Sequence, residues 1–166
     1  MTETLTAQTG EPETAASGQN AAPGPVLGTM NHIGITVSDL AESTERFYAP
    51  LLRFLGYEVI HQTAEMSVWL AASGCAVNLW QANPEHAERK PERYAPGFHH
   101  FAFNADSRET VDRCHDFLRE QGIEILDPPA DYDYEPGYYA LFFADPDGMK
   151  FELVHLPPPA SASIVA

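Results

Sequence analysis

The clearest pattern in the chain is an alternation of apolar and polar positions. Residues 31–37 read NHIGITV, in which every second side chain is apolar, and this period is typical of a strand with one buried face. Three further apolar segments at 57–61, 67–72 and 75–81 are predicted as strands, the last two joined at a Ser-Gly turn. The first half of the chain is therefore predicted to form four strands.

A helix is predicted between the first two of these strands. Asp39, followed three residues later by Glu42, resembles a capping box, in which each side chain bonds a free amide of the first turn. Pro50 interrupts the helix, either as a kink or within the first turn of a second helical segment. Gly56 supplies the left-handed conformation that ends many helices.

The same order of elements returns in the second half. Residues 100–103 alternate as the first strand does, residues 106–109 repeat the capping sequence, and residues 111–118 carry a helical apolar stripe. Residues 122–125 then match the strand after the first helix. The chain is interpreted as an internal duplication and predicted to be an α+β fold. Two paired βαβββ modules form a cupped mixed sheet with the helices outside.

The last two strands are joined by the turn sequence DPDG at 145–148. Its proline pre-sets φ and its first aspartate can bond back to the turn amides. In the strand that follows, Glu152 lies between Phe151 and Leu153. Because alternate strand residues point to opposite faces, Glu152 is predicted to face away from the core, toward a cavity, a metal or solvent.

Composition sets the boundaries of the folded part. Residues 1–29 are mostly Thr, Ala, Gly, Pro and Glu, so they bury too little apolar surface to fold and are predicted to be a disordered tail. The other predicted parts are a domain at 30–156, made of a module at 30–81, a linker at 82–97 and a module at 98–156, and a C-terminal tail at 157–166.

Charge and cysteine content narrow the class of partner. The net charge of −15 argues against a nucleic-acid or anionic-membrane partner, because both require basic surface. No apolar run approaches the length of about 18 residues that spans a bilayer. Cys75 and Cys114 match no metal or disulfide pattern. We therefore expect a cytoplasmic protein with a small-molecule partner.

Four polar residues occupy matched positions in the two modules. Counted from the hairpin glycine of each module, Asn78 is the counterpart of Glu152. His32 and His100 correspond because each stands at the start of the alternating first strand of its module. Two curved sheets facing each other would bring all four to one concave interior. Two imidazoles and a carboxylate with open positions suit a divalent transition metal in a catalytic site.

The paired modules, with the strand openings HIGITVSDL and HHFAF and the closing DPDGMKFELVH, resemble the vicinal oxygen chelate superfamily. This superfamily includes glyoxalase I, extradiol dioxygenases and bleomycin-resistance proteins, and the resemblance covers residues 30–156. It implies His32, His100 and Glu152 as metal ligands, with Asn78 at a weak or open fourth position. Since superfamily relatives are commonly dimers, it also implies a homodimer.

The resemblance implies three alternative functions. The first is a glyoxalase-like lyase or isomerase, in which a divalent Fe, Mn, Zn or Ni ion chelates vicinal substrate oxygens and stabilises an enolate. The second is an extradiol ring-cleaving dioxygenase, although Phe142 stands where those enzymes carry Tyr. The third is a metal-free ligand-binding protein similar to bleomycin-resistance proteins. No general base is identified, because Asn78 cannot act as one.

Three aromatic residues are the predicted substrate contacts. Trp80 shares the strand face of Asn78 and could line the cup. Tyr134 and Tyr139 belong to the acidic, aromatic stretch 131–139. This stretch is either a lid that excludes water from the site or an irregular surface loop.

Overall fold

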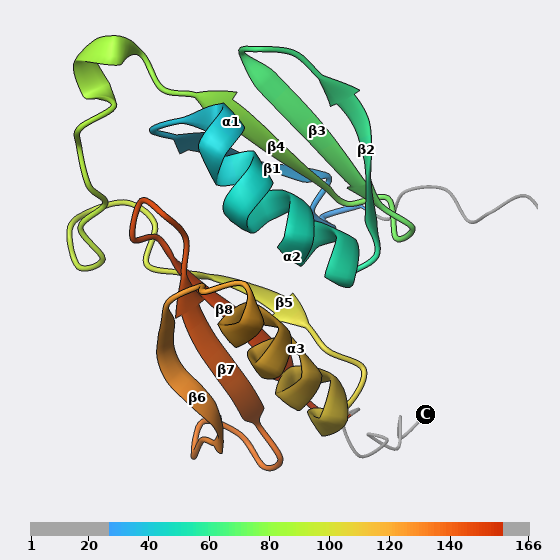
Figure 1. The fold of residues 1–166 in the computed structure, drawn as a ribbon. Helices are drawn as coiled ribbons and strands as arrows, with labels where there is room; N and C mark the ends of the chain where they lie inside the picture. The colour runs from blue at the N-terminus through green and yellow to red at the C-terminus, as the bar shows by residue number, and fades with distance from the viewer. Residues whose placement is uncertain (1–26, 158–166) are drawn as a thin grey trace, which may run out of the picture.

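The computed structural model describes residues 27–157, and the two predicted tails lie almost entirely outside this range. The described residues form two four-stranded mixed sheets with helices packed against them (Figure 1). The first module contains β1 (His32–Val37), α1 (Leu40–Ser43), a π-helical segment (Thr44–Tyr48), α2 (Ala49–Phe54), β2 (Tyr57–Gln62), β3 (Met66–Ala71) and β4 (Ala76–Gln81). The second contains β5 (Phe101–Asn104), α3 (Arg108–Glu120), β6 (Ile125–Asp131), β7 (Tyr139–Ala144) and β8 (Lys150–His155). The predicted α+β fold of two βαβββ modules is confirmed.

The two sheets have the same topology and the same register. Their strand orders are β1-β4-β3-β2 and β5-β8-β7-β6, and in each the first and last strands of the module pair in parallel. Gly34 lies opposite Asn78, and Ala102 lies opposite Glu152. The predicted correspondence between Asn78 and Glu152 is therefore a real structural equivalence.

The first helical region changes its winding before Pro50. Asp39 caps α1 by accepting a hydrogen bond from the Glu42 amide at 2.9 Å. The helical turn then becomes wider, because the Ala49 N–H donates to the Thr44 carbonyl five residues back. The helix α2 begins immediately before the proline. A proline has no N–H and clashes with the carbonyl four residues earlier, which a wider turn relieves. The interruption predicted at Pro50 is confirmed.

The cap of α3 differs by one residue from the repeated pattern. Ser107, not Asp106, is the capping residue, and its hydroxyl accepts the Thr110 amide at 3.1 Å. Asp106 instead accepts the Thr110 hydroxyl, because the serine already occupies the extended cap conformation. Among residues 27–157, no helix has both the length and the apolarity to cross a membrane.

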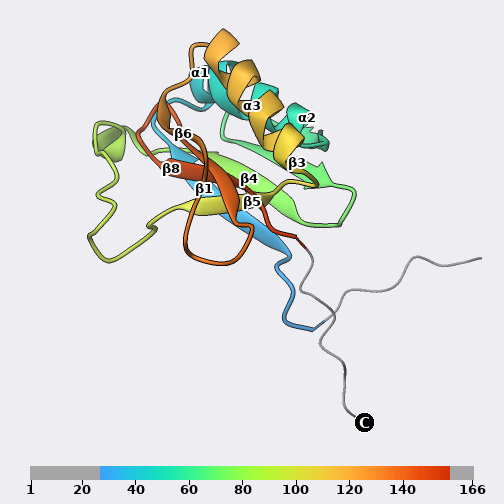
Figure 2. The same cartoon turned by 90° about the horizontal axis from the view of Figure 1, so that it is seen from below.

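One aromatic core joins the two modules. Phe47 of the π-helical segment lies 5.4 Å from Phe151 and 6.1 Å from Phe143 between ring centroids. Phe54 of α2 stacks on Phe117 of α3 at 5.3 Å. All three helices lie on the same side of the strands (Figure 2). Among the described residues, the opposite face of both sheets is therefore left without any of these helices.

The DPDG turn forms as predicted and is tied to the core. The Asp145 carboxylate accepts the amides of Asp147 and Met149 at 3.0 and 2.7 Å. The buried Tyr48 hydroxyl donates to the same carboxylate at 2.7 Å. Burial raises the pKa of the Asp145 carboxyl above its ordinary value. The turn is thus fixed by hydrogen bonds to a carboxyl that lies inside the protein.

Candidate functional site

Glu152 is the most deeply buried charged side chain on the face without helices, with only 1% of its surface exposed. Its neighbours Phe151 and Leu153 lie in the core that the helices cover, so Glu152 points the other way. Its partners in the adjacent strands are Ala102 of β5 and Phe142 of β7. The prediction that Glu152 faces away from the core is confirmed.

His100 contacts one oxygen of this carboxylate. The residue lies directly before β5, and its Nε2 is 3.2 Å from Oε2 of Glu152. His100, one of the ligands that the resemblance implies, is therefore the histidine that reaches Glu152. His99 lies beyond it, with the two Nδ1 atoms 2.7 Å apart.

Tyr138 contacts the other oxygen, and the sequence interpretation had missed it. Its hydroxyl donates a hydrogen bond to Oε1 of Glu152. Burial, followed by this hydrogen bond, raises the pKa of the Tyr138 phenol well above its ordinary value, so the phenol stays protonated at neutral pH. A signal was present, because Tyr138 and Phe142 are an even number of residues apart and share a strand face.

A small apolar cluster closes this part of the face over Glu152. Its buried members are Ala140, Phe142 and Val154, and the rings of Tyr132 and Tyr138 pack against it. The loop between β6 and β7 thereby covers the carboxylate, which explains its burial. The predicted lid at 131–139 does lie next to the site, although whether it moves stays a prediction.

His32 does not join His100 and Glu152. It is exposed at the start of β1, and its Nδ1 bonds the Asn31 side chain at 2.7 Å. Among residues 27–157, no three or more His, Cys, Asp and Glu side chains are grouped so that they could hold a metal ion. The structure thus brings together two of the three predicted ligands, and a metal-binding role for the three stays a prediction.

Asn78 presents an unpaired acceptor. Its Oδ1 is buried and has no hydrogen-bond partner in the described part of the chain. A buried acceptor without a donor costs free energy, so this oxygen is suited to a ligand or an ion. Imidazole nitrogens, carboxylates and amide oxygens are donor types that divalent metals accept, although Asn78 belongs to the first sheet and Glu152 to the second.

Trp80 follows on the same face and is 44% exposed. A Cβ at Gly34 would lie 3.7 Å from its Nε1, so the indole lies close to the β1 backbone. This placement agrees with the predicted role of Trp80 as a substrate contact, which stays a prediction.

Tyr139 lies on the wrong face for the role predicted from sequence. Its hydroxyl donates to Asp112 of α3 at 2.7 Å, and the Arg108 guanidinium lies 3.9 Å from its ring centroid. Because strand side chains alternate, Tyr138 takes the place beside Glu152 and Tyr139 packs toward the helix. Tyr134 is 70% exposed and stacks on Tyr132 with centroids 5.5 Å apart, so it remains accessible to a ligand.

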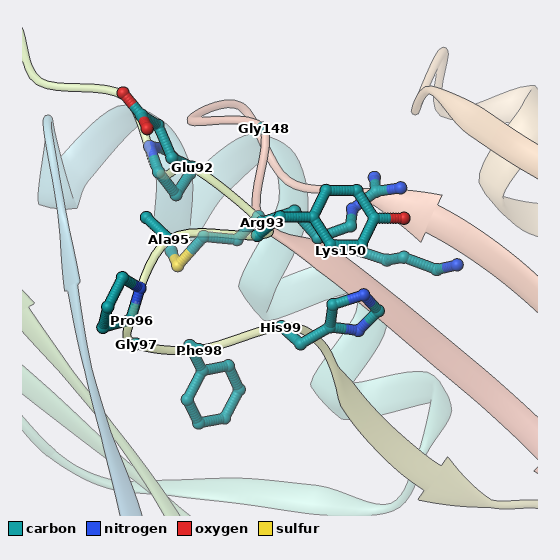
Figure 3. Close-up of a pocket in the computed structure, with 12 residues that line it drawn as sticks. Glu92, Arg93, Ala95, Pro96, Gly97, Phe98, His99, Gly148 and Lys150 are labelled. Atoms are coloured by element: carbon teal, nitrogen blue, oxygen red, sulfur yellow. The ribbon is translucent and has the colours of Figure 1, made fainter.

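The predicted linker folds against the start of β8 and forms a hollow of about 390 Å³ (Figure 3). Arg93, His99 and Lys150 are among the residues that line it. Partial desolvation lowers the pKa of His99, and interactions with the nearby His100, Lys150 and Arg93 lower it further. The hollow adjoins Glu152 through His100, so the two features form one extended site.

Comparison with known proteins places this geometry in context. A family model described as the Glyoxalase/Bleomycin resistance protein/Dioxygenase superfamily matches residues 29–153. The chain is 35% identical over 129 residues to the uncharacterized protein YqjT of Bacillus subtilis (strain 168), covering 75% of this chain and 97% of that protein. It is 28% identical over 155 residues to a 2-epi-5-epi-valiolone epimerase of Actinomyces sp, covering 81% and 82% of the two chains.

A solved structure shows the same arrangement. The crystal structure of a candidate glyoxalase from Bacillus halodurans superposes with a TM-score of 0.71 at 30% sequence identity. The match covers 78% of this chain and 97% of that one. The two chains therefore share one fold over most of their lengths.

Proposed function

Because the chain belongs to the glyoxalase/bleomycin resistance protein/dioxygenase superfamily, we propose that it is a metal-dependent isomerase. It moves a proton at a carbon next to a carbonyl group of a small, oxygen-rich metabolite. The observation that carries this proposal is the buried Glu152 held between His100 and Tyr138 on the face without helices. The similarity to 2-epi-5-epi-valiolone epimerase supports the reaction class.

A divalent metal ion is the cofactor of this proposal. His100 and Glu152 would hold it, and the unpaired Oδ1 of Asn78 is a further candidate donor. A bound ion of this kind supplies a Lewis acid that polarises a carbonyl oxygen.

The protein groups around Glu152 would orient it and exclude water. Tyr138 remains a hydrogen-bond donor at neutral pH because the pKa of its phenol is raised, and it holds the carboxylate in one position. The rings of Phe142 and Tyr132, whose centroids are 5.3 Å apart, pack beside the carboxylate. An apolar surrounding strengthens the electrostatic interactions of a charged site.

His99 is the group that we propose as proton acceptor. Its ring centroid lies 5.0 Å from that of His100, which places it beside the reaction site. An imidazole in its neutral form is able to take up a proton from such a carbon. His99→Gln should therefore lower turnover more than substrate affinity.

Metal analysis combined with isotope exchange tests the proposal. The protein is purified without chelator, offered Mn, Fe, Ni and Zn separately, and analysed for bound metal. Each loaded form is then incubated in D₂O with α-hydroxy ketones that include 2-epi-5-epi-valiolone, and NMR follows deuterium next to the carbonyl. We expect exchange that disappears with chelator and in His100→Ala and Glu152→Gln. Loaded protein that exchanges none of these substrates would overturn the proposal.

A metal-free ligand-binding protein is the second candidate. The observation that favours it is that both oxygens of Glu152 already have protein partners, so the carboxylate is satisfied without an ion. In this case the ligand would stack on exposed rings such as Trp80 and Tyr134. Absence of metal binding together with tight binding of a flat ligand would select this function over the isomerase.

A further inference from the structure

The hollow between the linker and β8 is connected to the surroundings of Glu152 through neighbouring residues of two segments. Lys150 lines the hollow and precedes Glu152 by two residues on β8. Residues two apart on a strand point to the same face and are separated by about 7 Å. His99 lines the hollow as well, and its neighbour His100 contacts Glu152.

The hollow gathers positive charge in an acidic protein. Arg93 and Lys150 both line it, although the net charge of the chain is −15. Within residues 27–157, neither has a carboxylate oxygen within ion-pair distance, whereas Lys90 of the same linker pairs with Asp147 at 3.3 Å. Because neither cation is paired with a carboxylate in this part of the chain, both are available to bind a negatively charged group in the hollow.

Other polar groups at the hollow set its shape and balance its charge. The Lys150 ammonium lies 3.7 Å from the ring centroid of Phe142, so its position is supported by an aromatic face. Glu92 is an acidic group in the lining, and Figure 3 shows it at the opposite end from Lys150 and His99. The carboxylates of Asp127 and Glu152 also act on Lys150, from outside the hollow.

We propose that this hollow binds an oxyanionic group of the substrate, a phosphate ester or a carboxylate. The guanidinium of Arg93 presents paired N–H donors that match the oxygens of such groups, and Lys150 adds a second positive charge. A volume of about 390 Å³ lies within the usual range of small-molecule sites. This inference rests on the proposed function in one respect only, which is that the reacting carbonyl group of the same substrate molecule lies at Glu152.

Anion binding to the metal-free protein tests the hollow without any turnover. Inorganic phosphate and acetate are titrated separately into the wild type, Arg93→Gln, Lys150→Gln and Arg89→Gln, with binding followed by calorimetry and by NMR shifts of the linker amides. Arg89→Gln is the matched control, because it removes the same charge from the same linker outside the hollow. Circular dichroism verifies that each variant is folded.

The expected result is a loss of at least about tenfold in affinity for Arg93→Gln and Lys150→Gln and no change for Arg89→Gln. Stronger binding of phosphate assigns a phosphorylated substrate, and stronger binding of acetate assigns a carboxylate. Binding of neither anion by the wild type overturns the inference, as does an equal loss in all three variants. If anions bind but no isotope exchange occurs, the anion site stands and the isomerase proposal fails.

Discussion

Tyr138 donates its phenolic hydrogen to Glu152, and this bond gives the buried carboxylate a protein partner on its Oε1. His100 occupies Oε2 at 3.2 Å. The two partners come from different segments, one directly before β7 and one directly before β5. Glu152 therefore holds the loop between β6 and β7 and the side chain of His100 in a fixed arrangement before any ligand binds.

Removing this hydroxyl should destabilise the fold. In Tyr138→Phe the ring remains, but the buried carboxylate loses a donor, and we expect the free energy of unfolding to fall by about 1–3 kcal/mol. Denaturant titration measures the change. Tyr134→Phe is the control, because that ring is largely exposed and the change there should stay within about 0.5 kcal/mol. Equal losses in the two variants would contradict the importance of the bond.

Asp145 should make stability depend on pH. Burial raises the pKa of its carboxyl, so the folded state keeps this proton to a higher pH than the unfolded chain does. Its contribution to stability therefore falls as the pH rises from the ordinary Asp value of 3.8 to the raised folded value. Asp145→Asn should remove this fall when unfolding is measured between about pH 4 and pH 7.

The substitution is conservative because the turn bonds survive it. The amide oxygen of an asparagine still accepts from Asp147 and Met149, and the Tyr48 hydroxyl can accept from its NH₂ group. If the free energy of unfolding changed with pH equally in the wild type and in Asp145→Asn, the Asp145 carboxyl would not titrate as described.

Periodicity predicted the fold and the equivalence of two site positions. Counting from the hairpin glycines placed Asn78 and Glu152 at equivalent positions, and the pairing with Gly34 and Ala102 bears this out. Such patterns are reliable because a strand with one buried face cannot slip by one residue without exposing its apolar side chains.

Tyr138 was missed although its parity with Phe142 places it on the same face as Glu152. It lies in the loop directly before β7, where the strand pattern ends. The opposite strand β6 carries register shifts between Ile125 and Asp127 and between Asp127 and Ala130, so pairing with β6 gives no independent count for a loop residue. The linker hollow was missed for a similar reason, since no periodic pattern relates Arg93 to Lys150.

The unpaired oxygen of Asn78 predicts opposite effects on stability and on metal binding. Asn78→Leu removes a buried acceptor that has no donor, so the metal-free protein should become more stable, by up to about 1–3 kcal/mol. If Oδ1 is a metal donor, metal affinity should fall in the same variant. Denaturant titration and calorimetry with the metal measure the two effects.

Thr44 offers a matched control for this test. Its Oγ1 is also buried and has no hydrogen-bond partner among residues 27–157, but it lies in the π-helical segment on the helix side of the sheet. Thr44→Val should give a similar gain in stability and leave metal affinity unchanged. A loss of metal affinity in both variants would show that the effect of Asn78 is indirect.

Gly137 controls the position of Tyr138. Its φ of +82° belongs to the left-handed region, and a Cβ there would lie 2.8 Å from Cγ of Pro157. Gly137→Ala should therefore cost the backbone strain of about 1–2 kcal/mol and, in addition, displace the loop that carries Tyr138. Gly74 has a φ of +86° but no atom within 4 Å of its would-be Cβ, so Gly74→Ala should cost the backbone strain alone. Denaturant titration of both variants, with isotope exchange as a second measurement, separates the two terms. The opposite result is that Gly137→Ala loses no more unfolding free energy than Gly74→Ala and leaves isotope exchange unchanged. That result would show that the loop between β6 and β7 adjusts without moving Tyr138 away from Glu152.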